Sequence, residues 1–194
     1  MSLVEDIKAI QRAAGVEADG IFGPRTAQAV LAELRKEDAG HSPAPLMDDR
    51  TRENLATLDV KARERFEQLC LLGKATAASL GCDWVMIEGH RTWEEQDALF
   101  AQRPKVTNAR GGQSNHNFGI AADFGVFCGK SYLDESNPIL ARRVHEACAV
   151  HARKLGFDWG GDWKMKDYPH FEISTGLTLA QKRKLYQKEG SVLP

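Results

Sequence analysis

Long apolar runs and an excess of charge of either sign are both missing from this sequence. No segment approaches the roughly 20 consecutive apolar residues that a bilayer-spanning helix needs. The 194 residues carry 26 Lys and Arg against 27 Asp and Glu, a formal net charge of -1, whereas nucleic-acid binders usually carry a clear basic excess. We therefore expect neither membrane insertion nor a nucleic-acid partner.

Clustered cysteines and a secretory signal are missing as well. A cysteine-based zinc site is not expected, because no C-x-x-C pair occurs, and a disulfide is neither required nor excluded. The first residues, MSLVEDIKAIQ, lack the basic start and apolar stretch of a signal peptide, which predicts synthesis in the cytoplasm. The four cysteines are scattered along the chain: Cys70, Cys82, Cys128 and Cys148.

Apolar content is high enough for a packed core, since hydrophobic residues make up 42% of the chain and charged residues 27%. Helical periodicity and short apolar runs alternate without a regular βαβ repeat, which indicates the α+β class. A capping box, Thr92 to Glu95, is expected to open one of the helices. The expected helices span residues 61–80, a stretch from 93, 138–156 and 179–188, and the expected strands span 84–87, 120–127 and 171–173.

The chain is expected to divide at a linker over residues 37–48, which is rich in Gly, Ser and Pro. Residues 1–36 predict a helix, a turn at Asp19-Gly20 and a second helix, because apolar residues recur at helical spacing on both sides of the turn. The remaining residues, 49–194, form the second and larger domain.

The run D-G-x-F-G-x-x-T, which begins at Asp19, resembles the small three-helix peptidoglycan-binding domain of many cell-wall hydrolases. The resemblance implies that residues 1–36 are a peptidoglycan-binding-like helical module. The alternative is a plain helical hairpin that packs on the rest of the protein, because so small a unit buries little core of its own.

Polar residues gather in three segments of the second domain where packing does not require them. The segment SNHNFGIAAD holds His116 in a loop and Asp123 in a strand with apolar neighbours, where a carboxylate must be paired, hydrogen-bonded or metal-bound. The segment DYPH places Asp167 three residues before His170. The third segment, EGHR over residues 88–91, follows a buried strand.

A His, Asp, His set suits zinc, which takes imidazole nitrogen and carboxylate oxygen in a tetrahedron and leaves a fourth place for water at catalytic sites. A general base must then take the proton of that water, and Asp167 is available for this. Spacing alone leaves an alternative open, in which His116 is a loop hydrogen-bonder and Asp123 a turn or capping residue.

The pattern S-x-H-x-x-G-x-A-x-D, which begins at Ser114, followed by D-x-x-H, which begins at Asp167, resembles the signature of the VanY-type zinc peptidases. These include D-alanyl-D-alanine carboxypeptidases and dipeptidases, and the L-alanyl-D-glutamate endopeptidases of phage endolysins. The resemblance covers residues 49–175. It implies a small zinc peptidase domain, similar to hedgehog and D-Ala-D-Ala peptidases, with a short antiparallel sheet behind the all-α module.

Carried over position by position, the resemblance implies three zinc ligands, a general acid/base, an oxyanion-binding arginine and two substrate-binding residues. In that order these are His116, Asp123 and His170, then Asp167, then Arg91, and finally Ser114 and Gln96. Asp at position 167, where the dipeptidases have Glu, is similar to the endolysin branch. His90 stands where many relatives carry an aromatic residue, which leaves its role open. Glu172 is expected on the opposite face of its strand from His170, as a salt-bridging or supporting residue.

The resemblance favours a zinc metallopeptidase, a hydrolase of the L-alanyl-D-glutamate bond in peptidoglycan. As a bacteriolytic endolysin it would be a monomer that waits in the cytoplasm until a holin releases it to the cell wall. Two alternatives remain: a D-alanyl-D-alanine carboxypeptidase, and a non-catalytic cell-wall-binding protein.

Overall fold

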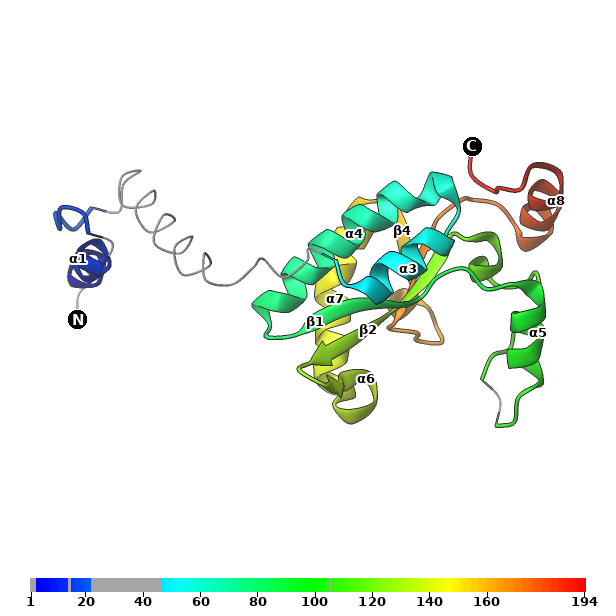
Figure 1. Cartoon of the computed structure of the whole chain (residues 1–194), viewed down its shortest axis with the longest axis horizontal. Helices are drawn as coiled ribbons and strands as arrows, with labels where there is room; N and C mark the ends of the chain where they lie inside the picture. Colours follow the sequence, from blue (N-terminus) through cyan, green and yellow to red (C-terminus); the bar gives the residue numbers. More distant parts are fainter. Residues whose placement is uncertain (1–2, 14, 22–46, 105) are drawn as a thin grey trace. The chain divides into compact units, whose positions relative to one another are not determined.

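A computed structural model of the chain describes residues 3–13, 15–21, 47–104 and 106–194 (Figure 1). The chain divides into two compact units, residues 1–46 and 47–194. The second helix expected near residues 27–34, and the linker up to residue 46, lie outside the described residues. Among the described residues, no helix has the length and apolarity to cross a membrane.

The first unit begins with helix α1 (Leu3–Ala13), whose Gln11 side chain fixes the turn that follows. Gln11 is 1% exposed, and its Nε2 donates to Asp19 Oδ1 at 2.7 Å and to the Ile21 carbonyl at 3.0 Å. Its Oε1 accepts from the Gly20 N–H at 2.9 Å. One buried amide thus satisfies the polar groups of the Asp19-Gly20 turn, whose Gly20 has φ +80°.

The second unit is built on a small antiparallel sheet, as the sequence predicts for the α+β class. Its strand order is β1-β2-β5-β4, with β3 paired to β2 off this path. The five strands are β1 (Asp83–Glu88), β2 (Ala121–Cys128), β3 (Ser131–Tyr132), β4 (Phe157–Trp159) and β5 (His170–Ile173).

Helices flank this sheet, and four of them follow the predicted ranges closely. These four are α4 (Val60–Ser79), α5 (Trp93–Ala101), α7 (Pro138–Lys154) and α8 (Leu179–Glu189). The Thr92–Glu95 capping box of α5 is confirmed. Elements that the sequence did not predict are α3 (Asp49–Thr57), α6 (Leu133–Ser136), β3, β4 and the 3-10 turns η1 (Asn115–Phe118) and η2 (Gly160–Asp162).

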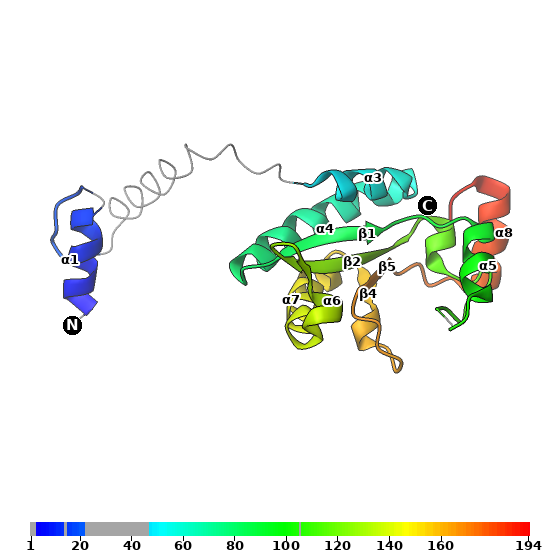
Figure 2. The same ribbon diagram turned by 60° about the horizontal axis from the view of Figure 1, so that its bottom comes forward.

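The core lies between one face of the sheet and the helices α4 and α7 (Figure 2). Trp84 of β1 stacks on Phe124 of β2 with ring centroids 3.7 Å apart, and Phe171 of β5 meets both rings edge-on. Helix α4 passes close over this cluster at Gly73, where an added Cβ would lie 2.1 Å from the Trp84 ring. Glycine is therefore needed at position 73 for close packing.

The opposite face of the sheet carries the polar residues. Asp123 of β2 pairs directly with His170 of β5, and an irregularity in β1 sets Glu88 opposite Asp123. Side chains alternate between faces along a strand, so Ala122, Phe124 and Phe171 enter the core while Asp123 and His170 turn away from it. The register therefore brings residues 47 positions apart in the sequence together.

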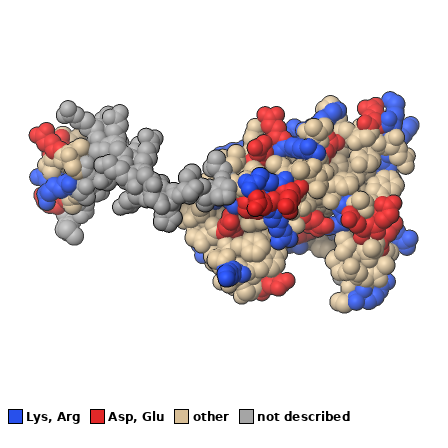
Figure 3. Space-filling model, in the orientation of Figure 1, with Lys and Arg blue, Asp and Glu red and all other residues tan. Residues whose placement is uncertain are grey.

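Charges of both signs are spread over the view of the second unit in Figure 3, where Lys and Arg alternate with Asp and Glu. This distribution agrees with the near-zero net charge of the sequence.

Candidate active site

A cavity of about 600 Å³ opens over the polar face of the sheet. Six of the seven residues implied by the resemblance line it, and Gln96 is the exception. Its walls come from β1, α5, residues 106–114, η1, β2, β5, the turn before β5 and the start of α8. The polar lining includes Glu88, Arg91, Ser114, His116, Asp123, Asp167, His170, Glu172 and Lys182.

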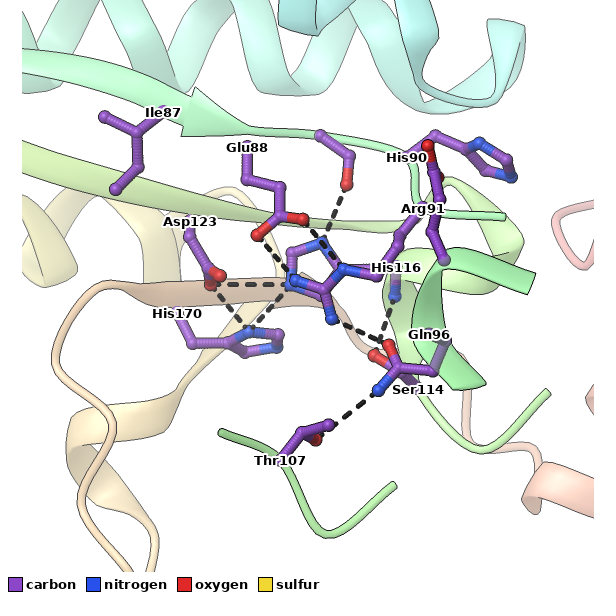
Figure 4. Close-up of polar contacts among 12 residues, drawn as sticks. Ile87, Glu88, His90, Arg91, Gln96, Thr107, Ser114, His116, Asp123 and His170 are labelled. Atoms are coloured by element: carbon purple, nitrogen blue, oxygen red, sulfur yellow. Dashed lines mark hydrogen bonds and ion pairs between the residues drawn. The ribbon is translucent and has the colours of Figure 1, made fainter. Parts of the chain in front are cut away.

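Three candidate metal-ligating atoms converge at the base of this cavity (Figure 4). His170 Nδ1 lies 3.0 Å from Asp123 Oδ1, His116 Nε2 lies 3.4 Å from the same oxygen, and the two ring nitrogens are 3.3 Å apart. In a zinc tetrahedron with bonds of about 2.0–2.1 Å, neighbouring ligand atoms are about 3.3–3.4 Å apart. The spacing of the three donors fits a zinc-sized cation.

Hydrogen bonds on the far sides of both imidazole rings orient them toward a common point. His116 Nδ1 lies 2.7 Å from the Gly89 carbonyl, and His170 Nε2 lies 2.9 Å from Glu172 Oε2. Because carbonyl and carboxylate oxygens only accept, these ring nitrogens are the donors, which leaves His116 Nε2 and His170 Nδ1, on the side of Asp123, to coordinate a metal or to carry a proton. Three converging acceptors require a positive charge between them, as metal sites with supporting hydrogen bonds provide.

The pKa values of His170 and Asp123 in the metal-free protein also indicate that a positive charge is favoured at this point. Burial alone would lower the pKa of His170, but hydrogen bonds to Asp123 and Glu172 raise it to about 10. Burial likewise opposes ionisation of Asp123, yet the two histidines hold the pKa of its carboxyl far below the usual range. A proton on His170 Nδ1 therefore supplies the positive charge in the place where a cation would bind.

Asp167 has the opposite electrostatic character. Burial first and the negative charge of Asp123 second raise the pKa of its carboxyl above the ordinary value. Its backbone is held by a hydrogen bond from its N–H to the Gly160 carbonyl at 3.1 Å. The two backbone segments approach each other closely there, since a Cβ at Gly160 would lie 2.3 Å from the Asp167 carbonyl oxygen. A carboxylate beside the cation site with a raised pKa is suited to accept and return a proton.

Arg91 lies at the edge of the same site, fixed by two neighbours (Figure 4). Its Nε and Nη2 donate to the two oxygens of Glu88 at 2.7 and 2.5 Å, and its Nη1 donates to Gln96 Oε1 at 2.7 Å. The Arg91 N–H also donates to the His116 carbonyl at 3.2 Å. The guanidinium is therefore a preorganised cation close to the three ligand atoms.

Gln96 differs from its expected role as a substrate-binding residue. Its side chain is fully buried, accepts from Arg91 and donates through Nε2 to the Ala109 carbonyl at 2.9 Å. It positions Arg91 from behind the cavity wall. Ser114, the other predicted substrate-binding residue, does line the cavity, and its Oγ accepts from the His116 N–H at 3.4 Å at the start of η1.

The sequence left the role of His90 open, and it predicted the wrong strand face for Glu172. His90 lines a separate pocket with Asp59 and Tyr186 and points away from the three ligand atoms (Figure 4). Glu172 shares a face with His170 and hydrogen-bonds to its ring, so the expectation of opposite faces is wrong, because residues i and i+2 of a strand point the same way. The spacing of the two residues was a sufficient signal for this contact. Glu88, the partner of Arg91, had no role assigned from the sequence.

Comparisons with known proteins point to one peptidase family. Residues 107–173 match a family model described as D-alanyl-D-alanine carboxypeptidase, of the M15 peptidases. The chain is also 42% identical, over 113 residues, to the peptidoglycan L-alanyl-D-glutamate endopeptidase CwlK of Bacillus subtilis. That alignment covers 52% of this chain and 66% of the relative, slightly less than two thirds of its length. The second unit is therefore similar to the M15 peptidases, with the family match confined to residues 107–173.

Two solved structures also resemble the chain. The L-Ala D-Glu endopeptidase ChiX of Serratia marcescens has a TM-score of 0.48 at 22% identity, covering 66% of this chain and 89% of ChiX. The vancomycin-resistance D,D-pentapeptidase VanY from a VanB-type cassette, solved with Zn(II), has a TM-score of 0.43 at 16% identity, covering 69% of this chain and 80% of that one.

Proposed function

We propose that this protein is a zinc-dependent peptidoglycan hydrolase that cleaves the L-alanyl-D-glutamate bond of the stem peptide. The observation that carries the proposal is the convergence of His116, Asp123 and His170 beside Asp167 in one cavity. The identity of 42% to a relative named for this activity supports the choice of bond.

The residues divide the chemistry among them. His116, Asp123 and His170 would hold the zinc, which would act as a Lewis acid and would lower the pKa of a water molecule to roughly 7. Asp167 accepts a proton from the attacking water and returns it to the leaving amine nitrogen. The Arg91 guanidinium, held by Glu88 and Gln96, stabilises the oxyanion that develops on the scissile carbonyl.

A second candidate is a D-alanyl-D-alanine carboxypeptidase, which the description of the matching family favours. Purified muropeptides with intact pentapeptide stems discriminate the two activities by mass spectrometry. We expect release of the stem without its L-alanine, as a peptide that begins with D-glutamate. Loss of a single terminal D-alanine would favour the carboxypeptidase, and unchanged substrate with zinc present would favour a non-catalytic binding protein.

The proposal extends to an endolysin role in which the first unit attaches the enzyme to the wall. Support comes from the D-G-x-F-G-x-x-T run and from the turn at its start, where the Gln11 side chain hydrogen-bonds to Asp19 and Gly20. Holding an enzyme at a polymeric substrate raises its effective concentration there without new catalytic contacts. In this role the protein acts on the wall after holin-type release, and addition of purified protein to outer-membrane-permeabilised or Gram-positive cells tests for lysis.

Deleting residues 1–45 should leave turnover of a short soluble muropeptide nearly unchanged, because every candidate site residue lies beyond them. Lysis of intact walls should decrease, since the truncated enzyme loses its second attachment. The full-length and truncated proteins should have the same melting temperature. Equal loss on both substrates, with a lower melting temperature, would instead make residues 1–36 part of the catalytic fold.

A further inference from the structure

A series of buried and partly buried polar side chains leads from the ring of His170 to the C-terminal helix α8. His170 Nε2 donates to Glu172 Oε2 at 2.9 Å, and Asn115 at the start of η1 lines the same cavity as that carboxylate. Asn115 Oδ1 in turn accepts from Lys182 Nζ at 2.8 Å. Lys182, on α8, is only 7% exposed. Three elements, η1, β5 and α8, therefore meet beside one candidate metal ligand.

The Glu172 carboxylate lies on the far side of the His170 ring from Asp123, because it contacts Nε2 at 2.9 Å while Nδ1 lies 3.0 Å from Asp123. An ionised carboxylate at His170 Nε2 holds the ring N–H on that side and leaves Nδ1, on the side of Asp123, to coordinate a metal or to carry a proton. A lysine as buried as Lys182 also needs a nearby negative charge, which Glu172 provides.

We propose that Glu172, Asn115 and Lys182 form a positioning relay through which α8 sets the tautomer and orientation of His170 and so the affinity of the site for zinc. The proposal rests on the proposed function, because it takes zinc as the cation. Helix α8 begins at Leu179, beyond the segment 107–173 that matches the family model. The relay therefore assigns a metal-site role to a part of the chain outside that match.

The relay predicts graded losses of zinc affinity in the full-length protein, measured by competition with a chromogenic zinc chelator. Glu172→Gln keeps the size of the side chain but removes its charge, and should weaken zinc binding by about 10- to 100-fold, the usual effect of losing such a partner. Lys182→Met should weaken it by a smaller factor, and Lys182→Arg, which keeps the charge, should restore most of the loss. Lys184→Met is the matched control, because Lys184 is exposed on the same helix.

Thermal unfolding with chelator present separates this effect from a folding defect. Glu172→Gln and Lys182→Met with wild-type zinc affinity would overturn the relay. A loss of affinity in Lys182→Met that Lys182→Arg does not reduce, or that Lys184→Met shares, would overturn the role of Lys182. Failure of the wild-type protein itself to bind zinc would instead contradict the proposed function.

An independent observation, at the other end of β2, concerns two cysteines. Cys82 immediately precedes β1 and Cys128 ends β2, and their Sγ atoms are 2.7 Å apart. The register Asp83↔Phe127 places them directly opposite each other across the strand pair. Cross-strand partners have Cα atoms about 4.5–5.5 Å apart, within the range that a disulfide bridges. Neither residue lines the 600 Å³ cavity.

We infer that Cys82 and Cys128 are a site of reversible oxidation to an intramolecular disulfide by a small disulfide such as oxidised glutathione. The thiolate of the more exposed Cys128 attacks the oxidant and releases one glutathione thiol. The thiolate of Cys82 then attacks Cys128 Sγ in the mixed disulfide and releases the second. The protein loses two protons and two electrons, which reduce the oxidant to two thiols.

Intact mass after treatment with oxidised glutathione, followed by alkylation in denaturant, tests this site. The wild-type protein should change from four alkylated cysteines to two, with a linked peptide pair containing Cys82 and Cys128. The bond closes a long loop, so it should raise the melting temperature by roughly 5–10 °C relative to the reduced protein.

Two variants separate this pair from the other cysteines. Cys82→Ser should abolish the bond and the difference in melting temperature, whereas Cys70→Ser, at a buried position in α4, should retain both. Four alkylated cysteines after oxidation of the folded wild-type protein, or a bond that survives Cys82→Ser, would overturn the assignment.

Discussion

Replacing His116 or His170 with alanine is expected to remove bound zinc and to reduce hydrolysis by more than about 10³-fold, because two protein ligands and water hold zinc poorly. The three candidate donors lie 3.0–3.4 Å apart, so each occupies one corner of the same tetrahedron. Elemental analysis of the purified proteins measures the metal, and release of soluble peptide measures the activity.

His151→Ala is the matched control for these variants. His151 is a histidine of α7 whose Nε2 lies 3.0 Å from Thr76 Oγ1, outside the cavity. The His151→Ala variant should retain one zinc per chain and full activity. One zinc per chain in both His116→Ala and His170→Ala would show that the ligand assignment is wrong.

Replacing Asp167 separates proton transfer from metal binding. Asp167→Ala should retain zinc but lose activity by roughly 10²–10⁴-fold, the usual contribution of a positioned proton acceptor. Asp123→Ala should lose zinc and activity together, because its Oδ1 lies within 3.4 Å of both ring nitrogens and forms the third corner of the ligand set. Loss of zinc from Asp167→Ala with retention in Asp123→Ala would reverse the two assignments.

The raised pKa of Asp167 adds a stability effect with a definite sign. A carboxyl whose pKa is higher in the folded than in the unfolded protein destabilises the fold at a pH above the folded pKa, and this effect vanishes below the unfolded pKa, about 3.9. With chelator present, Asp167→Asn should therefore unfold at a higher temperature than the wild type at pH 7, with a smaller difference at pH 4. A lower melting temperature at pH 7 would contradict the electrostatic description of this residue.

Local signals in the sequence were sufficient for the main helices but not for the meeting of the ligand atoms. The Thr92–Glu95 capping box and the Asn137-Pro138 start of α7 depend on contacts within one turn, so the local sequence is enough to predict them. The convergence of His116, Asp123 and His170 was anticipated because a motif resemblance supplied the long-range information that spacing lacks.

Features that depend on strand pairing could not be obtained from local patterns. Strands β3 and β4 are only two and three residues long, too short for a periodic signal. The contact between Cys82 and Cys128 follows from the β1–β2 register, and the burial of Gln96 follows from the path of residues 107–109 across α5. Each of these contacts depends on where a residue distant in the sequence lies, and local sequence patterns do not give that position.

Titration of the metal-free enzyme with zinc, followed by mass spectrometry of the peptidoglycan fragments at each step, tests the central claim most directly. We predict that hydrolysis is absent in chelator, increases in proportion to added zinc and stops increasing at one zinc per chain, with products cleaved between L-alanine and D-glutamate. Hydrolysis that persists in chelator, or fragments cleaved only at the terminal D-alanine, would contradict the account.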